Sequence, residues 1–443
     1  MIKKLTNVQI IAIGFLLLVL VGTGLLMLPF ASAEGERTSF LTALFTAVSA
    51  SCVTGLVLVD TATHWTVFGQ LVILFLIQTG GLGFITIATV FLSFARKNLG
   101  LKNRALMAES LNSDKIAGLK ETTKRILRWT LIFEGAGTLL LSVPFIREFG
   151  ALKGLYYAVF HSVSAFCNAG FDLMGVRGRF SSFETMSDDI IVNIVFMLLI
   201  SIGGIGFYVW EDVRRNGLKF RRYALHTKLA LTVSAILTFG GAILFLVFES
   251  GGVLTGVPLH KAILRSLFQS VTCRTAGFNT IDLGAISTPS LLLSCFLMFS
   301  GGSTGSTAGG IKTSTIAVVF IFLFTSLRAR RRPMLFGRSL SDEAVKKASG
   351  VICFNAALIF IGAVIITAVQ NLSLGDVLFE TFSAMGTVGM TTGITRTLAP
   401  ISKCVIIVLM FFGRVGSVTL ASAFFEKRAE PRVMYPVEEI SIG

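Results

Sequence analysis

Four short segments of the chain share one order of residue types that could strip water from a small cation. Each begins with phenylalanine, continues mainly through small and hydroxyl side chains, and reaches a glycine; the segments are residues 45–55, 160–170, 268–277 and 379–389. Glycine adopts backbone dihedral angles that strain other residues. Backbone carbonyls held in a ring can replace the water shell of an ion. The pattern therefore indicates dehydration and passage of a monovalent cation.

A second glycine pattern follows each segment. It reads Gly80-Gly81-Leu82-Gly83, Gly203-Gly204-Ile205-Gly206, Gly301-Gly302-Ser303-Thr304-Gly305 and Gly413-Arg414-Val415-Gly416, and it starts 25, 33, 24 and 24 residues after the first glycine. Because both patterns recur four times in the same order, the chain is predicted to hold four divergent copies of one unit.

The elements that must position these segments are long apolar runs. Apolar residues make up 53% of the 443 residues and charged residues only 14%, and about 20 residues of helix cross a bilayer. The glycine segments are too short and polar to span, so they are predicted to re-enter, each with a short helix whose C-terminal end favours a cation. The predicted fold is an all-α integral membrane protein: eight transmembrane helices and four re-entrant pore loops, arranged as four M1-P-M2 repeats around a pseudo-fourfold axis.

The repeats divide the chain at basic loops. Residues 1–95 are predicted as repeat 1, 96–210 as repeat 2, 211–327 as repeat 3 and 328–425 as repeat 4, with a cytoplasmic tail at 426–443; repeats 2 to 4 each include the cytoplasmic loop before them. Lys3 and Lys4, followed by an apolar run ending at Ala31-Ser32-Ala33, imitate a signal peptide. That run is longer than the usual 7–15 or so residues, so an uncleaved first span is expected.

The net charge of +15 is unevenly distributed. Of 39 Lys and Arg residues, 27 lie in five stretches separated by pairs of apolar runs. This alternation follows the positive-inside rule and predicts a multi-pass cell-membrane protein with both termini in the cytoplasm. It also accounts for the charge without a nucleic-acid partner.

At the glycine segments the chain resembles the potassium-translocating subunits of the Ktr/Trk/HKT superfamily, and its short start resembles the Ktr type. Val53-Thr54-Gly55 is similar to the filter of potassium channels. The resemblance implies a filter made by Cys52, Val53, Thr54, Gly55, Cys167, Asn168, Ala169, Gly170, Arg274, Thr275, Ala276, Gly277, Gly386, Thr387, Val388 and Gly389. Four filter glycines go with potassium preference in that family, whereas serine in the first goes with sodium transport.

The resemblance further implies potassium uptake, with K⁺ as the transported ion; a sodium or poorly selective cation transporter is the alternative. It implies a homodimer on a cytosolic ring of nucleotide-binding regulatory subunits, with the nucleotide on that partner only. Residues 328–332 and 427–443 are the predicted docking segments. An enzyme is disfavoured because the apolar runs hold no paired carboxylates, no HExxH and no nucleophile with a base.

A polar stretch at residues 301–313 interrupts the second apolar run of repeat 3. It imitates a phosphate-binding loop, but Ile311 separates Gly310 from Lys312. It is predicted to lie beneath the filter, and the resemblance makes it a gate; a packing kink is the alternative. The gate residues are Gly301, Gly302, Ser303, Thr304, Gly305, Ser306, Thr307, Ala308, Gly309, Gly310, Lys312 and Arg414.

Arg414 lies within the last apolar run, where a charge is costly and usually functional. It is predicted to face the same pore as residues 301–313, either as a barrier to cations or as an anchor of the loop. A structural ion pair with Glu134 or Glu380 is the alternative.

Other polar residues flank the filter. Asp60, Asp172 and Asp282 follow three of the glycines and either line an outer vestibule or cap helices; the fourth copy has Ile394 instead. Thr46, His161, Gln269 and Glu380 each follow the opening phenylalanine, and Glu380 is predicted to be a structural carboxylate. Cys52, Cys167 and Cys273 lack metal-site spacing and are predicted to pack as small residues.

Overall fold

The structure is a computed structural model that describes residues 7–83, 119–328 and 333–416. It is helical, which confirms the all-α prediction. The described strands, β1 (Met334–Leu335) and β2 (Arg338–Ser339), have two residues each and pair as an antiparallel hairpin. The α-helices are α1 Asn7–Leu26, α2 Phe40–Ser51, α3 Thr61–His64, α4 Val67–Leu82, α7 Leu119–Phe149, α8 Ala151–Phe166, α9 Ile190–Ile205, α10 Phe207–Asn216, α11 Leu225–Phe248, α12 Leu259–Thr272, α13 Thr288–Phe299, α14 Thr313–Leu327, α15 Asp342–Val369, α16 Leu374–Gly386 and α17 Pro400–Val415. Within the described residues six 3₁₀ turns lie between them: η1 Pro29–Ala31, η2 Met174–Val176, η3 Glu184–Met186, η4 Phe220–Arg222, η5 Leu283–Ala285 and η6 Ile394–Thr397.

Four of the described helices, α1, α7, α11 and α15, are long and apolar enough to cross a membrane. Helices α9 and α10 together would make a fifth, but the chain bends by 94° between them. Large apolar side chains such as Leu131 and Leu139 of α7 are exposed on the outer face, where lipid would cover them. The chain is therefore a multi-pass membrane protein, and the finer prediction of eight spans remains a prediction.

The described helices form four triplets: α1, α2 and α4; α7, α8 and α9; α11, α12 and α13; and α15, α16 and α17. In three of them every helix packs on the other two, whereas in the third α11 packs on both α12 and α13. In each triplet the middle helix is short and buries at least half of its residues, and it ends inside one of the four glycine segments, a few residues before the final glycine. Small Ala and Ser residues in these short helices let their neighbours approach closely.

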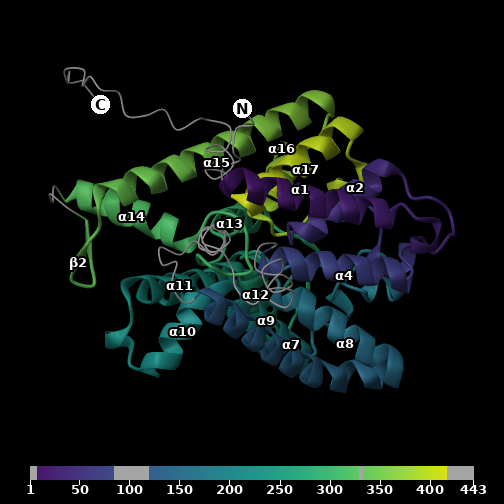
Figure 1. The fold of residues 1–443 in the computed structure, drawn as a ribbon, viewed down its shortest axis with the longest axis horizontal. Helices are drawn as coiled ribbons and strands as arrows, with labels where there is room; N and C mark the ends of the chain where they lie inside the picture. The colour runs from purple at the N-terminus through teal and green to yellow at the C-terminus, as the bar shows by residue number, and fades with distance from the viewer. Residues whose placement is uncertain (1–6, 84–118, 329–332, 417–443) are drawn as a thin grey trace.

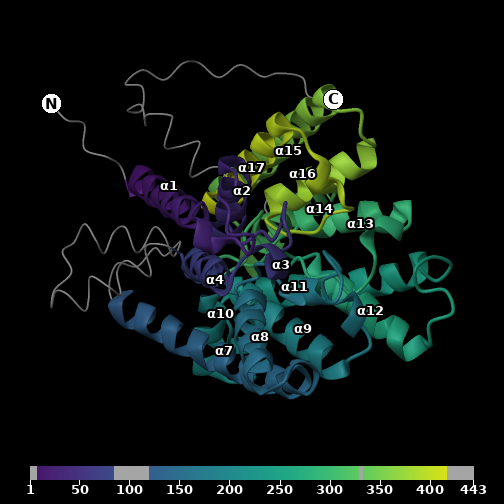
Figure 2. The same cartoon turned by 90° about the vertical axis from the view of Figure 1, so that its right-hand side faces the viewer.

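The triplets close into a ring. The last helix of each packs on the short helix of the next, in the pairs α4 with α8, α9 with α12, α13 with α16, and α17 with α2. Figure 1 shows the molecule from one side, and in Figure 2 the triplets follow one another around it in chain order. Each short helix is therefore held between its own triplet and the one before.

The second glycine pattern allows this packing. A Cβ placed on Gly80, Gly203 or Gly413 would lie well under 3.0 Å from a carbonyl oxygen at the end of the short helix in the same triplet. Those oxygens belong to Ser51, Phe166 and Met385. Only glycine permits so close an approach of two backbones.

The same pattern also breaks helices. Gly83, Gly206 and Gly416 have φ of 86°, 101° and 97° and directly follow the ends of α4, α9 and α17. The sequence predicts a break only in the third copy, where α13 ends at Phe299 and α14 begins at Thr313. The expectation was incomplete, because a glycine at positive φ ends a helix even inside an apolar run.

Replacement of Gly80 by alanine tests this contact. The added methyl group would collide with the Ser51 carbonyl, and overpacking of this kind costs about 1–3 kcal/mol. We expect Gly80→Ala to lower the melting temperature of the purified protein. Gly240→Ala in α11 is the control, because a Cβ there meets nothing within 4 Å. Equal melting temperatures for the two variants would contradict the packing role.

Candidate ion pathway

The glycines that end the four segments meet in a closed ring. Their φ angles are positive: 92° at Gly55, 68° at Gly170, 81° at Gly277 and 95° at Gly389. A Cβ on each would fall under 3.0 Å from the carbonyl oxygen that precedes the next glycine, in the chain order 55, 170, 277, 389 and back to 55. The four segments therefore touch one another through backbone alone.

Positive φ angles occur at alternate residues at the end of each segment. The residue two positions earlier also has positive φ: 50° at Val53, 59° at Asn168, 81° at Thr275 and 50° at Thr387. Alternating left-handed and ordinary conformations can turn successive carbonyls toward the same side of the strand. The third segment keeps this register although it is one residue shorter, because its helix α12 ends earlier.

One column of hydroxyl residues holds these backbones in place, and the sequence analysis missed it. The fourth residue after each opening phenylalanine is Ser49, Ser164, Thr272 or Ser383. Its carbonyl accepts a hydrogen bond of 2.8–2.9 Å from the amide of the residue before the glycine. The signal was present in the aligned segments, since all four residues carry a hydroxyl.

The hydroxyls of this column bind the same loops. Ser49 and Ser383 each accept a hydrogen bond of 3.1 Å from the amide of the filter glycine. Ser164 and Thr272 instead donate to the carbonyl of the residue after the glycine, at 2.7 and 2.8 Å. Each segment is thus fixed to its short helix by both backbone and side chain.

The side chains of the predicted filter residues take different directions. Arg274 turns away to α11, where it donates to Ser234 and Thr238 at 3.0–3.3 Å. Only its backbone can belong to the ring. Cys52 and Cys167 are buried thiols, and the described residues hold no cluster of potential metal ligands.

A cavity of about 130 Å³ opens on one side of the ring. The four glycines line it, with residues one or two positions after them: Val57, Phe171, Asn279 and Thr391. Asp60, Asp172, Glu184, Asp282 and Arg396 also line it. Asp60 also caps α3, and Asp282 caps η5. Asp60 and Asp282 therefore both line this cavity and cap a helix, and a vestibule role remains a prediction.

Glu184 and Arg396 were not found in the sequence because they have no counterparts in the other copies. The Arg396 guanidinium lies 4.3 Å from the centre of the Phe180 ring. Nearby, Asp188 accepts hydrogen bonds of 2.8 Å from Lys261 and Arg265, and these donors hold the pKa of Asp188 below its usual value.

Side chains of two short helices, α8 and α16, hydrogen-bond to the residues that follow the glycines. His161 accepts from the Leu173 amide at 3.0 Å, and Glu380 accepts from Thr391 at 2.7 Å and from Thr395. The geometry agrees with Glu380 as a structural carboxylate.

Residues 301–312 lie at the other end of the segments. A Cβ on Gly309 would collide with Thr387, and one on Gly301 would lie 3.4 Å from Thr275. Asn168 donates to the Thr307 hydroxyl at 2.9 Å. The loop therefore contacts side chains two positions before the glycines, whereas the cavity adjoins the glycines and the residues after them.

This loop is hydrogen-bonded to two other copies directly. Ser303 donates to the Gly204 carbonyl at 2.8 Å, and Phe207, at the start of α10, donates to the Gly305 carbonyl at 2.7 Å. The Gly310 amide donates to the Gly413 carbonyl at 3.2 Å.

Arg414 completes the set of contacts. Its guanidinium donates to the carbonyls of Thr307 and Gly80, and to that of Gly81 at 2.8 Å. An ion pair with Glu134 or Glu380 is not formed: Glu134 accepts from Gln78, and Glu380 is held by threonines. Arg414 therefore joins the loop of the third copy to the first copy through backbone carbonyls, and its role as barrier or anchor remains a prediction.

Of the predicted docking segments, residues 329–332 and 427–443 lie outside the described residues, as does the tail from residue 417. Arg328, at the end of α14, is described and exposed.

Comparison with known proteins decides the family. The family model of TrkH cation transport proteins matches residues 4–431. The chain belongs to this family. It is 40% identical over 448 residues to the potassium/sodium uptake protein NtpJ of Enterococcus hirae, covering all of this chain and 98% of the relative.

Two further relatives have similar coverage. Identity to the Ktr system potassium uptake protein B of Bacillus subtilis is 38%, over 99% of this chain and 97% of that protein. The crystal structure of the potassium transporter TrkH from Vibrio parahaemolyticus is similar in fold, with a TM-score of 0.74 and 20% identity over 96% of this chain and 86% of that one.

Removal of one hydroxyl from the column tests how the ring of this TrkH-family chain is held. Ser383→Ala leaves the Gly389 amide without its acceptor, which costs about 1–3 kcal/mol for a buried group. We expect a lower melting temperature. Ser402→Ala is the control, because that buried hydroxyl has no hydrogen-bond partner. A Ser402→Ala loss as large as that of Ser383→Ala would argue against the clamp.

Proposed function

We propose that the chain carries potassium into the cell through the ring formed by its four glycine segments. The observation that carries the proposal is the closed contact of Gly55, Gly170, Gly277 and Gly389 through backbone oxygens. A ring of carbonyls is the arrangement that replaces the hydration shell of a potassium ion. The curated relatives named above are potassium uptake proteins, which supports the same cargo.

The arrangement in the membrane follows from this proposal. Eight spans and four re-entrant loops would place the acidic cavity outside and the basic loops, with both termini, in the cytoplasm. The cavity acids then raise the local concentration of cations at the entrance.

Sodium is the alternative cargo, and the name of the Enterococcus hirae relative includes it. Four glycines in the ring favour potassium, because a side chain at any of them would disturb the spacing of the carbonyls. Uptake of rubidium, as a tracer for potassium, measured against sodium in proteoliposomes separates the two readings.

Serine in place of Gly55 should weaken the preference for potassium. The side chain would collide with the Ala169 carbonyl 2.6 Å away, and φ of 92° would be strained. We expect sodium to compete more effectively with rubidium uptake. Gly35→Ser is the matched control, since Gly35 also has positive φ but nothing within 4 Å of a Cβ. Unchanged competition in Gly55→Ser would remove this segment from the filter.

We further propose that residues 301–312 form an intramembrane gate anchored by Arg414. The loop lies against Thr275 and Thr387, where an ion leaving the ring toward the cytoplasm would pass. It is held by hydrogen bonds to the carbonyls of Gly204 and Gly413 and from the Phe207 amide, and through Arg414 to the first copy. The loop must move before an ion passes.

Loss of the anchor should open the gate. We expect Arg414→Gln to raise basal rubidium flux and shortening of residues 302–310 to do the same. Combined, the changes should give less than the sum of their effects on the logarithm of flux, because residues sharing an interaction couple. Lys403→Gln, earlier in α17, is the control. Additive effects would show that Arg414 and the loop act separately.

The Bacillus subtilis relative is named as part of a Ktr system, which supports a regulatory partner for this chain. We propose that two copies of this chain assemble on a ring of nucleotide-binding subunits, and that the nucleotide binds those subunits alone. Residues 328–332 and 427–443 are the proposed docking segments.

A further inference from the structure

A second cavity lies where α7 and α10 meet, and it shares no lining residue with the cavity at the glycine ring. It has a volume of about 300 Å³ and is lined by Arg125, Arg128, Trp129 and Arg214. Three guanidinium groups and an indole ring therefore surround one open space. The proposed transport route uses none of them.

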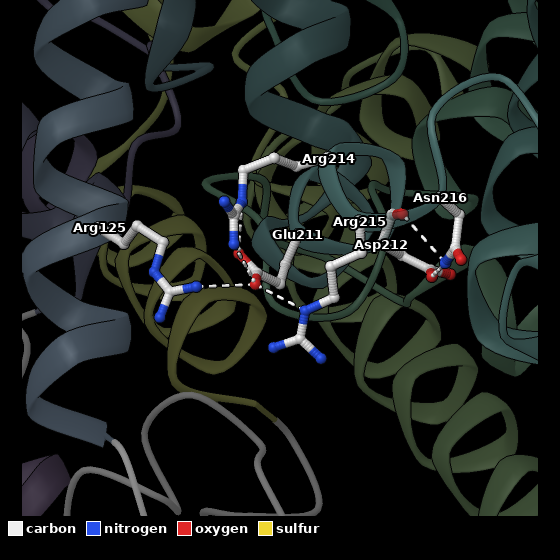
Figure 3. A network of polar contacts seen from close by, with 6 residues as sticks. All are labelled: Arg125, Glu211, Asp212, Arg214, Arg215 and Asn216. Atoms are coloured by element: carbon white, nitrogen blue, oxygen red, sulfur yellow. Dashed lines mark hydrogen bonds and ion pairs between the residues drawn. The ribbon is translucent and has the colours of Figure 1, made fainter.

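The two carboxylates of α10 beside this cavity, Glu211 and Asp212, already have hydrogen-bond partners. Glu211 of α10 accepts hydrogen bonds from Arg125 at 2.7 Å, Arg214 at 3.0 Å and Arg215 at 2.8 Å (Figure 3). Asp212 instead binds Asn216 and the Ala224 amide. One carboxylate thus faces several arginines, and the local charge remains positive.

Arg128 is the least engaged of these arginines. It is exposed, and no ion pair joins it to another described residue. Arginine presents a planar set of donors that suits the oxygens of a phosphate group. Arg128 is therefore available to an anionic ligand without any change in the contacts of Glu211.

The cavity lies at a boundary along α7. In the membrane arrangement proposed above, the outer end of that helix lies near Glu148, which pairs with Arg177 of the segment after the second glycine. Trp129 lies 20 residues before the last residue, Phe149, which is about 30 Å of helix and close to the thickness of the hydrocarbon layer. Trp129 is thus one membrane thickness from the outer end.

The exposed face of α7 changes character at this point. Lys124 and Arg128 precede Trp129 on exposed positions, whereas exposed Leu131, Leu139 and Val143 follow it. Tryptophan is enriched at such membrane–water boundaries. Helix α10 turns by 94° from α9 and so does not continue that span. The cavity therefore opens where a headgroup would lie, with an apolar face beside it for the acyl chains.

We propose that this cavity binds the phosphate headgroup of an anionic phospholipid from the cytoplasmic leaflet. Arg128 and Arg214 contact the phosphate, Trp129 lies at the level of the glycerol, and the acyl chains lie along α7. Basic pockets between helices on the cytoplasmic side are suited to such headgroups. The lipid then bridges α7 and α10, which Arg125 and Glu211 already join.

Native mass spectrometry of the detergent-solubilised full chain tests the proposal. The probes are phosphatidylglycerol, phosphatidylcholine and inorganic phosphate, each titrated separately. We expect tight binding of phosphatidylglycerol to the parent protein and about tenfold weaker binding to Arg128→Gln, because a charge-assisted hydrogen bond is lost. Lys124→Gln, on the same helix but outside the cavity, should bind like the parent.

A second readout uses Trp129 with all arginines intact. Phosphatidylglycerol should change the tryptophan fluorescence of the parent, and this change should be lost in Trp129→Phe. Equal binding of phosphatidylglycerol to Arg128→Gln and Lys124→Gln would overturn the proposal. So would equal affinity for phosphatidylcholine, or displacement of the lipid by inorganic phosphate, which would indicate a site for free anions.

Discussion

The contact of four glycines through bare backbone is the constraint on which the rest of the structure depends. No side chain fits between Gly55, Gly170, Gly277 and Gly389, so each segment sets the position of the next. The ring of helix triplets holds these contacts from outside, because the last helix of each triplet presses on the short helix of the next. Displacement of one segment would therefore disturb all four.

Two layers support the ring, and they differ in symmetry. The hydroxyl column is present in all four copies and binds each segment to its own helix. The loop at residues 301–312 has no counterpart in the described parts of the other three copies, yet its contacts reach the first, second and fourth.

The sequence predicted the parts that repeat. Four aligned glycines and their flanking apolar runs indicated the helical class and the meeting of residues 55, 170, 277 and 389, because repetition separates signal from chance. The hydroxyl column could have been found in the same alignment. Arg396 and Glu184 could not, because single residues in the outer cavity have no counterparts to reveal them. The carbonyl partners of Arg414 were equally hidden, since backbone acceptors leave no trace in residue types.

The most direct measurement locates the ion. Crystals grown with thallous ions, whose anomalous scattering distinguishes them from water, would show where a potassium-like cation binds. The account predicts a peak on the axis of the ring, equidistant from the carbonyl oxygens of Thr54, Ala169, Ala276 and Val388. Well-ordered peaks elsewhere in the protein, with none between these four oxygens, would contradict it.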